Sequence, residues 1–454
     1  MTNTKLPILN VQHTFPEVIS DVRSGGLPQD TFWLSCYGDG PGIHSKVRVT
    51  LDDIQRDVVK LDGSLGIEIK EQGKNVSIAF SGFPLQIALS ISRRNMPCSP
   101  ASTAFKRLYC WSPRTYMLTP IARIHNMQPH RITAFDVAPD GSQFASGFLD
   151  GSVHIYNTTP KIQPVETAFG KIHKSTTSSL RFFPSSRVLL SAGADFTLCI
   201  LPAEPSPSSS SLSAVRTLMG HKRVVTSTAI VSRGRNIVSG SLDGTIRLWD
   251  VSSGAQIHLF TTGGATGRLA PITGMSLGER GGTVLPNAPS VANPDTREVE
   301  TSDKLLFCAL QTKSFEAIDL GSRQTVFSGS ATAPLSSISY SPENSLLATG
   351  SNKGIVDVYD TRALSEGRVL VSFARGNNQA GIADLQWANN GGQLLVGTDD
   401  GLPFIASIDS SSTPRVAGEL VGTDCDAVRC LRAAGNSVWT AADDGVVRRY
   451  DQLW

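Results

Sequence analysis

The sequence lacks the long apolar runs that a membrane-spanning segment requires. No stretch of its 454 residues reaches the roughly 18 consecutive apolar residues of a spanning helix. Charge of one sign is also scarce, because 41 Lys and Arg against 39 Asp and Glu leave a net charge of +2. Electrostatic attraction of the whole protein to nucleic acid is therefore not indicated. We expect a protein of the cytoplasm and nucleus that binds neither membranes nor nucleic acid.

Cysteine is scarce and irregularly spaced. The seven cysteines are odd in number, and no two of them form a CxxC pair. Most lie in apolar, strand-like surroundings, where a reduced and buried thiol is expected. The sequence also lacks phosphate-binding loops and metal-ligand spacings. We therefore expect a non-enzyme with no metal, no cofactor and no catalytic residues, in a reducing compartment.

Glycine and proline, by contrast, are abundant, at 41 and 25 residues, which is typical of a turn-rich β protein. An Asp-Gly turn or a close equivalent, followed by an alternating strand, recurs along the chain. The copies lie about 45 residues apart, the spacing of WD repeats. One interval is of double length and contains a degenerate copy at 304–320. The turn positions are Asp150, Asp195, Asp243, Lys353, Asp400 and Asp444.

These copies predict an all-β protein with a seven-bladed WD-repeat β-propeller at 115–454. Each unit reads as four strands, a to d, and the last copy ends at its strand c. Residues 115–124 form a spare strand ahead of the first copy. We expect this strand to pair with the last blade and close the ring, because an open edge would otherwise remain. Residues 1–114 are expected to form a separate, small β-rich domain.

One copy carries a full set of polar residues at the spacing of the WD-repeat hydrogen-bonded tetrad: His221, Ser239, Asp243 and Trp249. There the carboxylate pairs with the imidazole, the imidazole with the hydroxyl, and the hydroxyl with the indole N–H. Because buried polar groups must be paired, such a network holds the strands of a blade in place. A His, Ser and Asp together also occur in nucleophilic catalysis, but this tetrad leaves no exposed nucleophile. We interpret it as structural.

One face of the predicted propeller remains open for a partner. The two long insertions, 202–214 and 278–302, fall in c–d and a–b connections, which share a face. The opposite face keeps short turns, and residues 301–454 carry 17 acidic against 12 basic residues. These acids are interpreted either as ordinary solvated turn residues or as a patch over blades 6 and 7 that attracts a basic partner. The candidate partner-binding residues are Asp384, Asp399, Asp424, Asp426 and Asp443.

Several longer strings resemble a specific family. They include "LRFFPSSRVLLSAGAD", "LMGHKRVVTSTAIVSRGRNIVSGSLDGTIRLWD" and the closing "GTDCDAVRCL…DDGVVRRY". Together with "FWLSC", "REVETSDKLLFCAL" and "GSRQTVF", they are similar to the proteasomal ATPase-associated factor family. The resemblance implies a non-enzymatic assembly chaperone of the proteasome regulatory-particle base, and we expect the protein to be a monomer. Such a chaperone would bind the C-terminal domain of an ATPase subunit and meet other base assembly chaperones.

Two other functions are compatible with a propeller. One is a scaffold or substrate receptor of another complex, such as a ubiquitin ligase or a ribosome-assembly machine. The other is a propeller hydrolase, which would need carboxylates or histidines clustered around the central channel. The repeat pattern indicates no such cluster.

Overall fold

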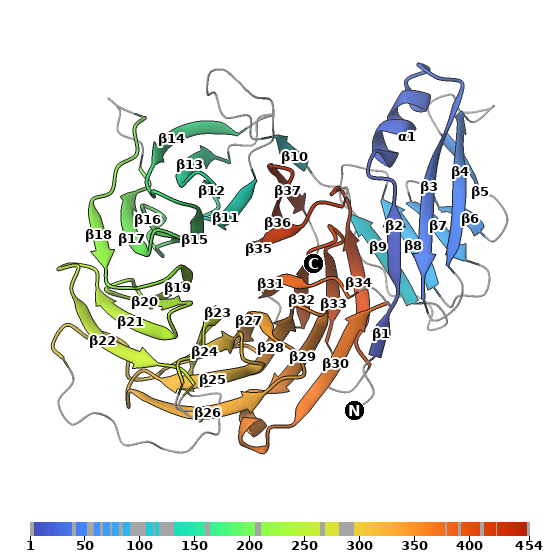
Figure 1. The fold of residues 1–454 in the computed structure, drawn as a ribbon. Helices are drawn as coiled ribbons and strands as arrows, with labels where there is room; N and C mark the ends of the chain where they lie inside the picture. Colours follow the sequence, from blue (N-terminus) through green and yellow to red (C-terminus); the bar gives the residue numbers. More distant parts are fainter. Residues whose placement is uncertain are drawn as a thin grey trace.

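The computed structural model describes most of the chain. The described residues are 4–38, 42–51, 59–63, 67–72, 75–80, 85–90, 106–111, 114–117, 131–158, 164–204, 210–263, 268–280, 295–376, 379–388, 392–408, 413–423 and 425–451. Between 67 and 117 only the backbone of the strands is described. The dominant feature is a ring of seven blades, each of four antiparallel strands, and two of these blades belong to larger sheets of five and eight strands (Figure 1).

The first four blades follow one another along the chain, each with its strands in the order a to d. Blade 1 consists of β11 (Ile132–Val137), β12 (Gln143–Phe148), β13 (Ser152–Asn157) and β14 (Val165–Lys171). Blade 2 consists of β15 (Thr177–Phe182), β16 (Val188–Gly193), β17 (Thr197–Pro202) and β18 (Arg216–Met219). Blade 3 consists of β19 (Val225–Val231), β20 (Asn236–Ser241), β21 (Thr245–Asp250) and β22 (Gln256–Thr261). Blade 4 consists of β23 (Ile272–Glu279), β24 (Lys304–Leu310), β25 (Ser314–Asp319) and β26 (Gln324–Ser330).

The last three blades also recruit strands from the N-terminal part of the chain. Blade 5 consists of β27 (Leu335–Ser341), β28 (Leu346–Ser351), β29 (Ile355–Asp360) and β30 (Val369–Arg375), with the 3-10 helix η3 (Thr361–Glu366) after β29. Blade 6 consists of β31 (Ile382–Trp387), β32 (Gln393–Thr398), β33 (Phe404–Ser407) and β34 (Arg415–Leu420). Blade 7 consists of β35 (Val428–Ala434), β36 (Ser437–Ala442), β37 (Val446–Asp451) and β10 (Arg114–Met117).

The ring is closed by β10, which runs antiparallel to β37. Thr115 lies opposite Arg448, and Met117 opposite Val446. Blade 7 thus receives its fourth strand from a segment more than 300 residues earlier in the chain, and no strand c edge remains exposed there. The strand begins one residue before the predicted segment 115–124, and residues 118–124 lie outside the described part of the chain.

The N-terminal region contains a helix and two further sets of strands. The set β2 (Ile8–Val11), β3 (Gln29–Tyr37), β4 (Ile43–Leu51) and β5 (Val59–Gly63) is antiparallel, and the helix α1 (Phe15–Arg23) packs on it through Phe15. The other set is β6 (Ile67–Gln72), β7 (Asn75–Phe80), β8 (Leu85–Ser90) and β9 (Lys106–Trp111).

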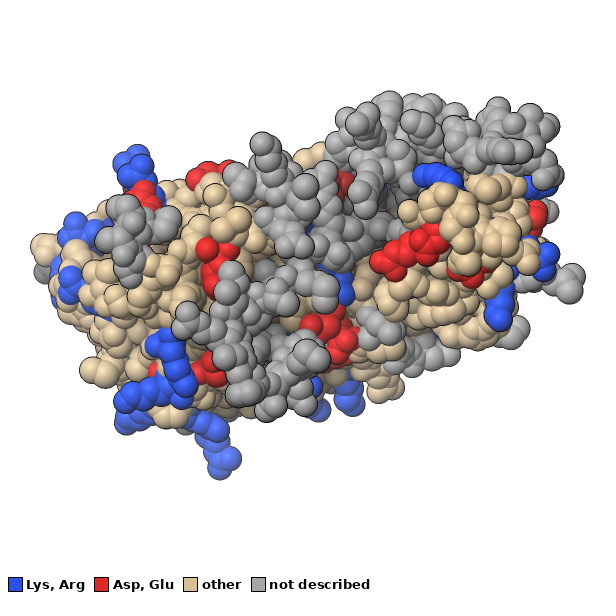
Figure 2. Space-filling model, turned by 90° about the horizontal axis from the view of Figure 1, so that it is seen from above, with Lys and Arg blue, Asp and Glu red and all other residues tan. Residues whose placement is uncertain are grey.

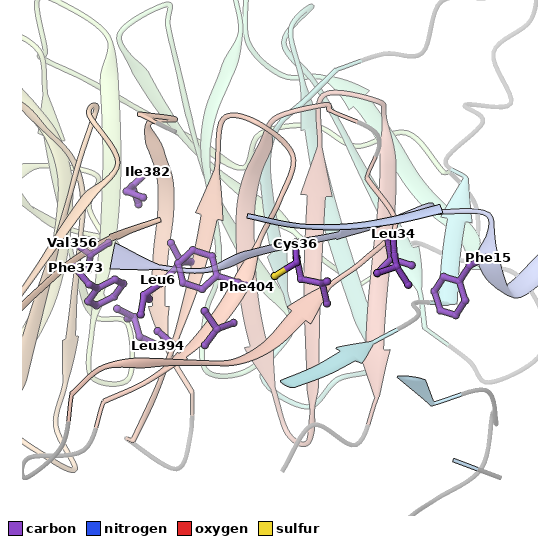
Figure 3. Close-up of a cluster of buried hydrophobic side chains, with 14 of the residues drawn as sticks. Leu6, Phe15, Leu34, Cys36, Val356, Phe373, Ile382, Leu394 and Phe404 are labelled. Carbon is purple, nitrogen blue, oxygen red and sulfur yellow. The ribbon is translucent and has the colours of Figure 1, made fainter. Parts of the chain in front are cut away.

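This region is not packed as a unit of its own. Strand β9 pairs in parallel with β34 of blade 6, and β1 (Thr4–Leu6) with β30 of blade 5. A single apolar cluster joins Leu6 and Leu34 to Phe373 and Phe404 of these blades (Figure 3). The expectation of a separate domain at 1–114 is therefore corrected in one respect. The region does not pack as an independent unit, because its apolar side chains pack against the propeller. The boundary at 114/115 stays a prediction.

Each contact between neighbouring blades has its own apolar cluster. Hydroxyls at the second position of strand a add a second connection. In blades 1 to 5 the hydroxyl donates to the carbonyl of the first strand-a residue of the next blade, over 2.5–2.9 Å. The donors are Thr133, Ser178, Thr226, Thr273 and Ser336. Blades 6 and 7 have Ala383 and Arg429 at this position, so their junctions depend on other contacts.

Candidate protein-interaction face

The b–c turns and d–a loops lie on one face of the propeller, which we call the open face. The long connections 203–215 and 280–303 join strands c and d of blade 2 and strands a and b of blade 4, so both emerge on the opposite face. This matches their predicted placement. Viewed from above, basic and acidic side chains are interspersed along the described part of the propeller (Figure 2). The open face is the part of the fold that is free of long insertions among the described residues.

In blade 3 the structure brings the four predicted tetrad residues together. The Trp249 indole N–H donates to Ser239 Oγ over 2.9 Å, and Ser239 Oγ lies 2.8 Å from His221 Nε2. The other ring nitrogen, Nδ1, lies 3.1 Å from Asp243 Oδ2. Both the imidazole and the indole are buried, so the network ties the d–a loop before blade 3 to its strands b and c.

The Asp243 carboxylate is held ionised by its partners. Burial acts to raise the pKa of Asp243, but hydrogen bonds from His221, from the Thr245 hydroxyl and from the Lys222 N–H outweigh it, and the pKa lies well below its ordinary value. The carboxylate therefore accepts hydrogen bonds at every physiological pH.

Blade 2 contains a related set of hydrogen-bonded side chains that was not predicted from the sequence. His173 Nε2 lies 2.7 Å from Ser191 Oγ, and His173 Nδ1 lies 3.1 Å from Asp195 Oδ1. Leu201 stands where blade 3 has its tryptophan. The signal was present, because His173 precedes Asp195 by the same 22 residues that separate His221 from Asp243. The absent Trp concealed it.

Two of the predicted partner-binding acids meet on the open face. Arg429, at the start of β35, donates from Nη1 to Asp399 Oδ1 over 3.0 Å. Its Nε and Nη2 donate to the two oxygens of Asp443 over 3.1 and 2.9 Å. Asp399 keeps 46% of its side chain exposed, whereas Asp443 keeps only 11%. Burial and the neighbouring Asp400 and Asp443 raise the pKa of Asp399 against the opposing effect of Arg429.

The other predicted acids are arranged differently. Asp384 accepts from Arg432 Nη1 and from the Leu431 N–H, each over 2.9 Å, so it belongs to another ion-pair group. Asp426 is half-buried in the d–a loop before blade 7. Asp424 lies outside the described residues. The described residues therefore do not form a single patch of five exposed acids.

Arg432 lies at the junction where the ring closes. Its Nε donates to Asp136 Oδ1 of blade 1 over 2.8 Å, while its Nη1 contacts Asp384 of blade 6. Burial acts to lower the pKa of Arg432, but these two carboxylates outweigh it and raise the pKa above its ordinary value. One guanidinium therefore joins blades 6, 7 and 1. On this side of the ring, Ala383 and Arg429 occupy the positions at which the other blades have a Ser or Thr hydroxyl.

The seven strands a line a central channel of about 430 Å³. Its wall is rich in Ser and Thr hydroxyls, with Arg181 and Arg432 on blades 2 and 7. Within the described residues there is no group of three or more His, Cys, Asp and Glu that could hold a metal ion. Searched over the same residues, the helices include none long and apolar enough to cross a membrane.

Comparison with protein families agrees with this geometry. Residues 122–157 and 212–250 match the model described as "WD domain, G-beta repeat", and residues 338–417 match "Anaphase-promoting complex subunit 4 WD40 domain". The matched repeats and the ring of four-stranded sheets define an all-β WD-repeat β-propeller, which confirms the predicted fold class. Neither matching model describes a catalytic family.

Individual proteins are similar over parts of the chain. A guanine nucleotide-binding protein subunit beta of Oryza sativa subsp. japonica is 25% identical over 301 residues, 65% of this chain and 73% of that protein. The 26S proteasome regulatory subunit RPN14 of Saccharomyces cerevisiae is 37% identical over 129 residues, 28% of this chain and 29% of that protein. Proteasomal ATPase-associated factor 1 of Gallus gallus is 29% identical over 181 residues, 40% of this chain and 43% of that protein. The chain thus spans less than half of the two proteasomal relatives, and the comparisons support a WD-repeat scaffold.

Proposed function

We propose that this WD-repeat scaffold is an assembly chaperone of the proteasome regulatory-particle base. It binds the C-terminal domain of an ATPase subunit through the open face. The observation that carries the proposal is the similarity to RPN14 and to proteasomal ATPase-associated factor 1, whose names connect both to the proteasome. The protein acts as a monomer in the cytoplasm and nucleus, alongside other chaperones of the base.

The geometry supports a contact of this kind over blades 6 and 7. Asp399 and Asp443 share the single guanidinium of Arg429, so the group keeps an excess of negative charge. Asp399 keeps 46% of its side chain exposed on this face. A partner domain with exposed Lys or Arg side chains complements such a group, and charges at the rim of an interface act mainly on the rate of association.

Binding of the separately purified C-terminal domains of the ATPase subunits tests the proposal. We expect one of them to bind, and Asp399→Lys to weaken its binding about threefold to tenfold at low salt and less at high salt. Glu204→Lys is the matched control, because Glu204 is also exposed and pairs with one arginine, Arg187, over 3.0 Å on the opposite face. It should leave binding unchanged.

The proposal is contradicted if the folded wild-type protein binds none of these domains. Recovery of pre-ribosomes or cullin adaptors in its place would favour the scaffold or substrate-receptor function. Equal weakening by Asp399→Lys and Glu204→Lys would move the interface away from blades 6 and 7.

A further inference from the structure

A second surface lies on the open face, over blades 1 to 3. Four large apolar side chains are exposed there, each in a b–c turn or next to a d–a loop. Their exposed fractions are 51% for Leu149, 41% for Phe196, 75% for Met219 and 56% for Leu269. Soluble proteins expose single apolar side chains routinely, but a group of them on one face marks an interaction site. We call these four side chains the apolar rim.

Contacts between neighbouring loops connect the apolar rim from blade 1 to blade 2. The Thr176 hydroxyl donates to the Leu149 carbonyl, and the Thr176 carbonyl accepts from the Ala194 N–H, two residues before Phe196. Thr197 lies opposite Met219 in the pairing of β17 with β18. Leu149, Phe196 and Met219 therefore lie on adjacent loops of one face, and Leu269 lies in the next d–a loop along the chain.

Phe196 occupies a backbone conformation that the repeat normally reserves for glycine. Its φ is +73°, and the corresponding turn residue is glycine in blades 1, 3, 5, 6 and 7, with φ between +75° and +86°. A bulky residue in this region is strained, because its side chain crowds the backbone. The aromatic ring at this position is not needed for the core, because it is exposed. An exposed aromatic side chain kept at a cost to the backbone indicates a contact outside the chain.

Exposed cations accompany the apolar rim. Lys174 lies in the d–a loop before blade 2, and Lys222 and Arg223 lie in the loop before blade 3. The carboxylates of Asp195 and Asp243, in the adjacent turns, are directed to His173 and His221 and lie mostly buried. The charge offered to a partner at blades 2 and 3 is therefore positive, opposite in sign to the group around Asp399, whereas blade 1 has the exposed Asp150 beside Leu149.

We propose that the apolar rim and its cations bind an acidic segment of a partner protein that carries large apolar side chains. The carboxylates of the segment pair with Lys222 and Arg223, and its apolar side chains cover Phe196 and Met219. Aromatic side chains and Arg are the residue types that dominate binding energy at such interfaces. This inference rests on blades 1 to 3 alone and is independent of the proposed contact at blades 6 and 7.

A synthetic 20-residue amphipathic peptide with Glu on one face and Leu and Phe on the other is the probe. Its binding to the full chain is followed by fluorescence anisotropy. We expect this peptide to bind at least about tenfold more tightly than a version with Lys for Glu or with Ser for Leu and Phe. The variant Lys222→Glu/Arg223→Glu should weaken binding about tenfold, whereas Arg233→Glu, an exposed reversal in an a–b turn of the opposite face, should not.

Phe196→Gly separates binding from folding. It relieves the backbone strain, so the melting temperature should stay equal or rise, while peptide binding falls severalfold. Met219→Ser should also weaken binding, and Val215→Ser, just before β18 and similarly exposed, should not. Failure of the acidic peptide to bind, equal binding of the Lys version, or full binding by Phe196→Gly would each overturn the proposal. Concentration-dependent self-association that Phe196→Gly abolishes, without peptide binding, would assign the rim to a second copy of this chain instead.

Discussion

The ion pairs at the ring junction make the sharpest stability prediction. Replacing Arg432 by Met keeps most of the side-chain volume and removes the guanidinium. Asp136 and Asp384 then lose their shared cation, although both side chains remain at most 23% exposed. Breaking a buried ion pair from one side costs about 3–5 kcal/mol, because the remaining charge is left without compensation.

The remaining contacts of the two carboxylates reduce this cost. Asp136 keeps the Phe182 N–H at 2.7 Å and the Arg181 guanidinium at 3.8 Å, and Asp384 keeps the Leu431 N–H at 2.9 Å. We therefore expect Arg432→Met to lower the free energy of unfolding by about 2–4 kcal/mol. The matched control is Arg429→Met on the same strand. Arg429 also binds two aspartates, but it is 42% exposed, and exposed ion pairs contribute about 1 kcal/mol or less.

Urea unfolding followed by tryptophan fluorescence measures both variants. The double variant Asp384→Asn/Arg432→Met should recover part of the lost free energy of unfolding, because it no longer leaves the Asp384 charge without the guanidinium of Arg432. The reasoning would be refuted if Arg432→Met stayed within 1 kcal/mol of the wild type, or if it cost no more than Arg429→Met.

Three further predictions concern the blades. Trp249→Ala should cost about 3–5 kcal/mol, because it removes a buried indole and strands the Ser239 hydroxyl; an unchanged melting temperature would contradict this. Because the folded-state pKa of Asp243 is lowered from 3.8, its contribution is present above about pH 4 and is lost as the pH falls below it. Melts of Asp243→Asn and the wild type should therefore differ at pH 7 and converge toward pH 2, and a constant difference would argue against the ionised tetrad. Thr226→Val should cost about 1 kcal/mol in urea unfolding, and no loss would show that the hydroxyl contact to blade 4 is dispensable.

The repeat and the tetrad could be predicted because their signals are local in sequence. Asp243 and Gly244 form the turn, and Ser239 and Trp249 follow from the strand alternation on either side of it. The partners of the acids could not be predicted in this way. Arg429 and Arg432 are close in sequence to none of Asp136, Asp384 and Asp399, and they meet them only through the register of neighbouring blades.

The contribution of the N-terminal region was missed for a similar reason. The alternation of strands such as Gln29–Tyr37 indicates a β-rich region but not the surface it covers. Leu6 and Leu34 could equally bury their side chains within a small domain. That they pack on Phe373 and Phe404 follows from the parallel pairing of β1 with β30, and parallel pairing over so long a separation leaves no local pattern.

The link between the start of the chain and blade 6 has a consequence for synthesis on the ribosome. The Leu9 N–H donates to buried Glu419, which lies 410 residues later, and Glu419 also pairs with Arg375. At a synthesis rate of roughly 5–20 residues per second, about 20–80 s pass between synthesis of the N-terminal strands and synthesis of the blade 6 residues on which they pack. Contacts of such long range slow folding. Until blade 6 emerges, Leu6 and Leu9 belong to a nascent chain with exposed apolar surface, so the protein is itself expected to depend on cellular chaperones while it is being made.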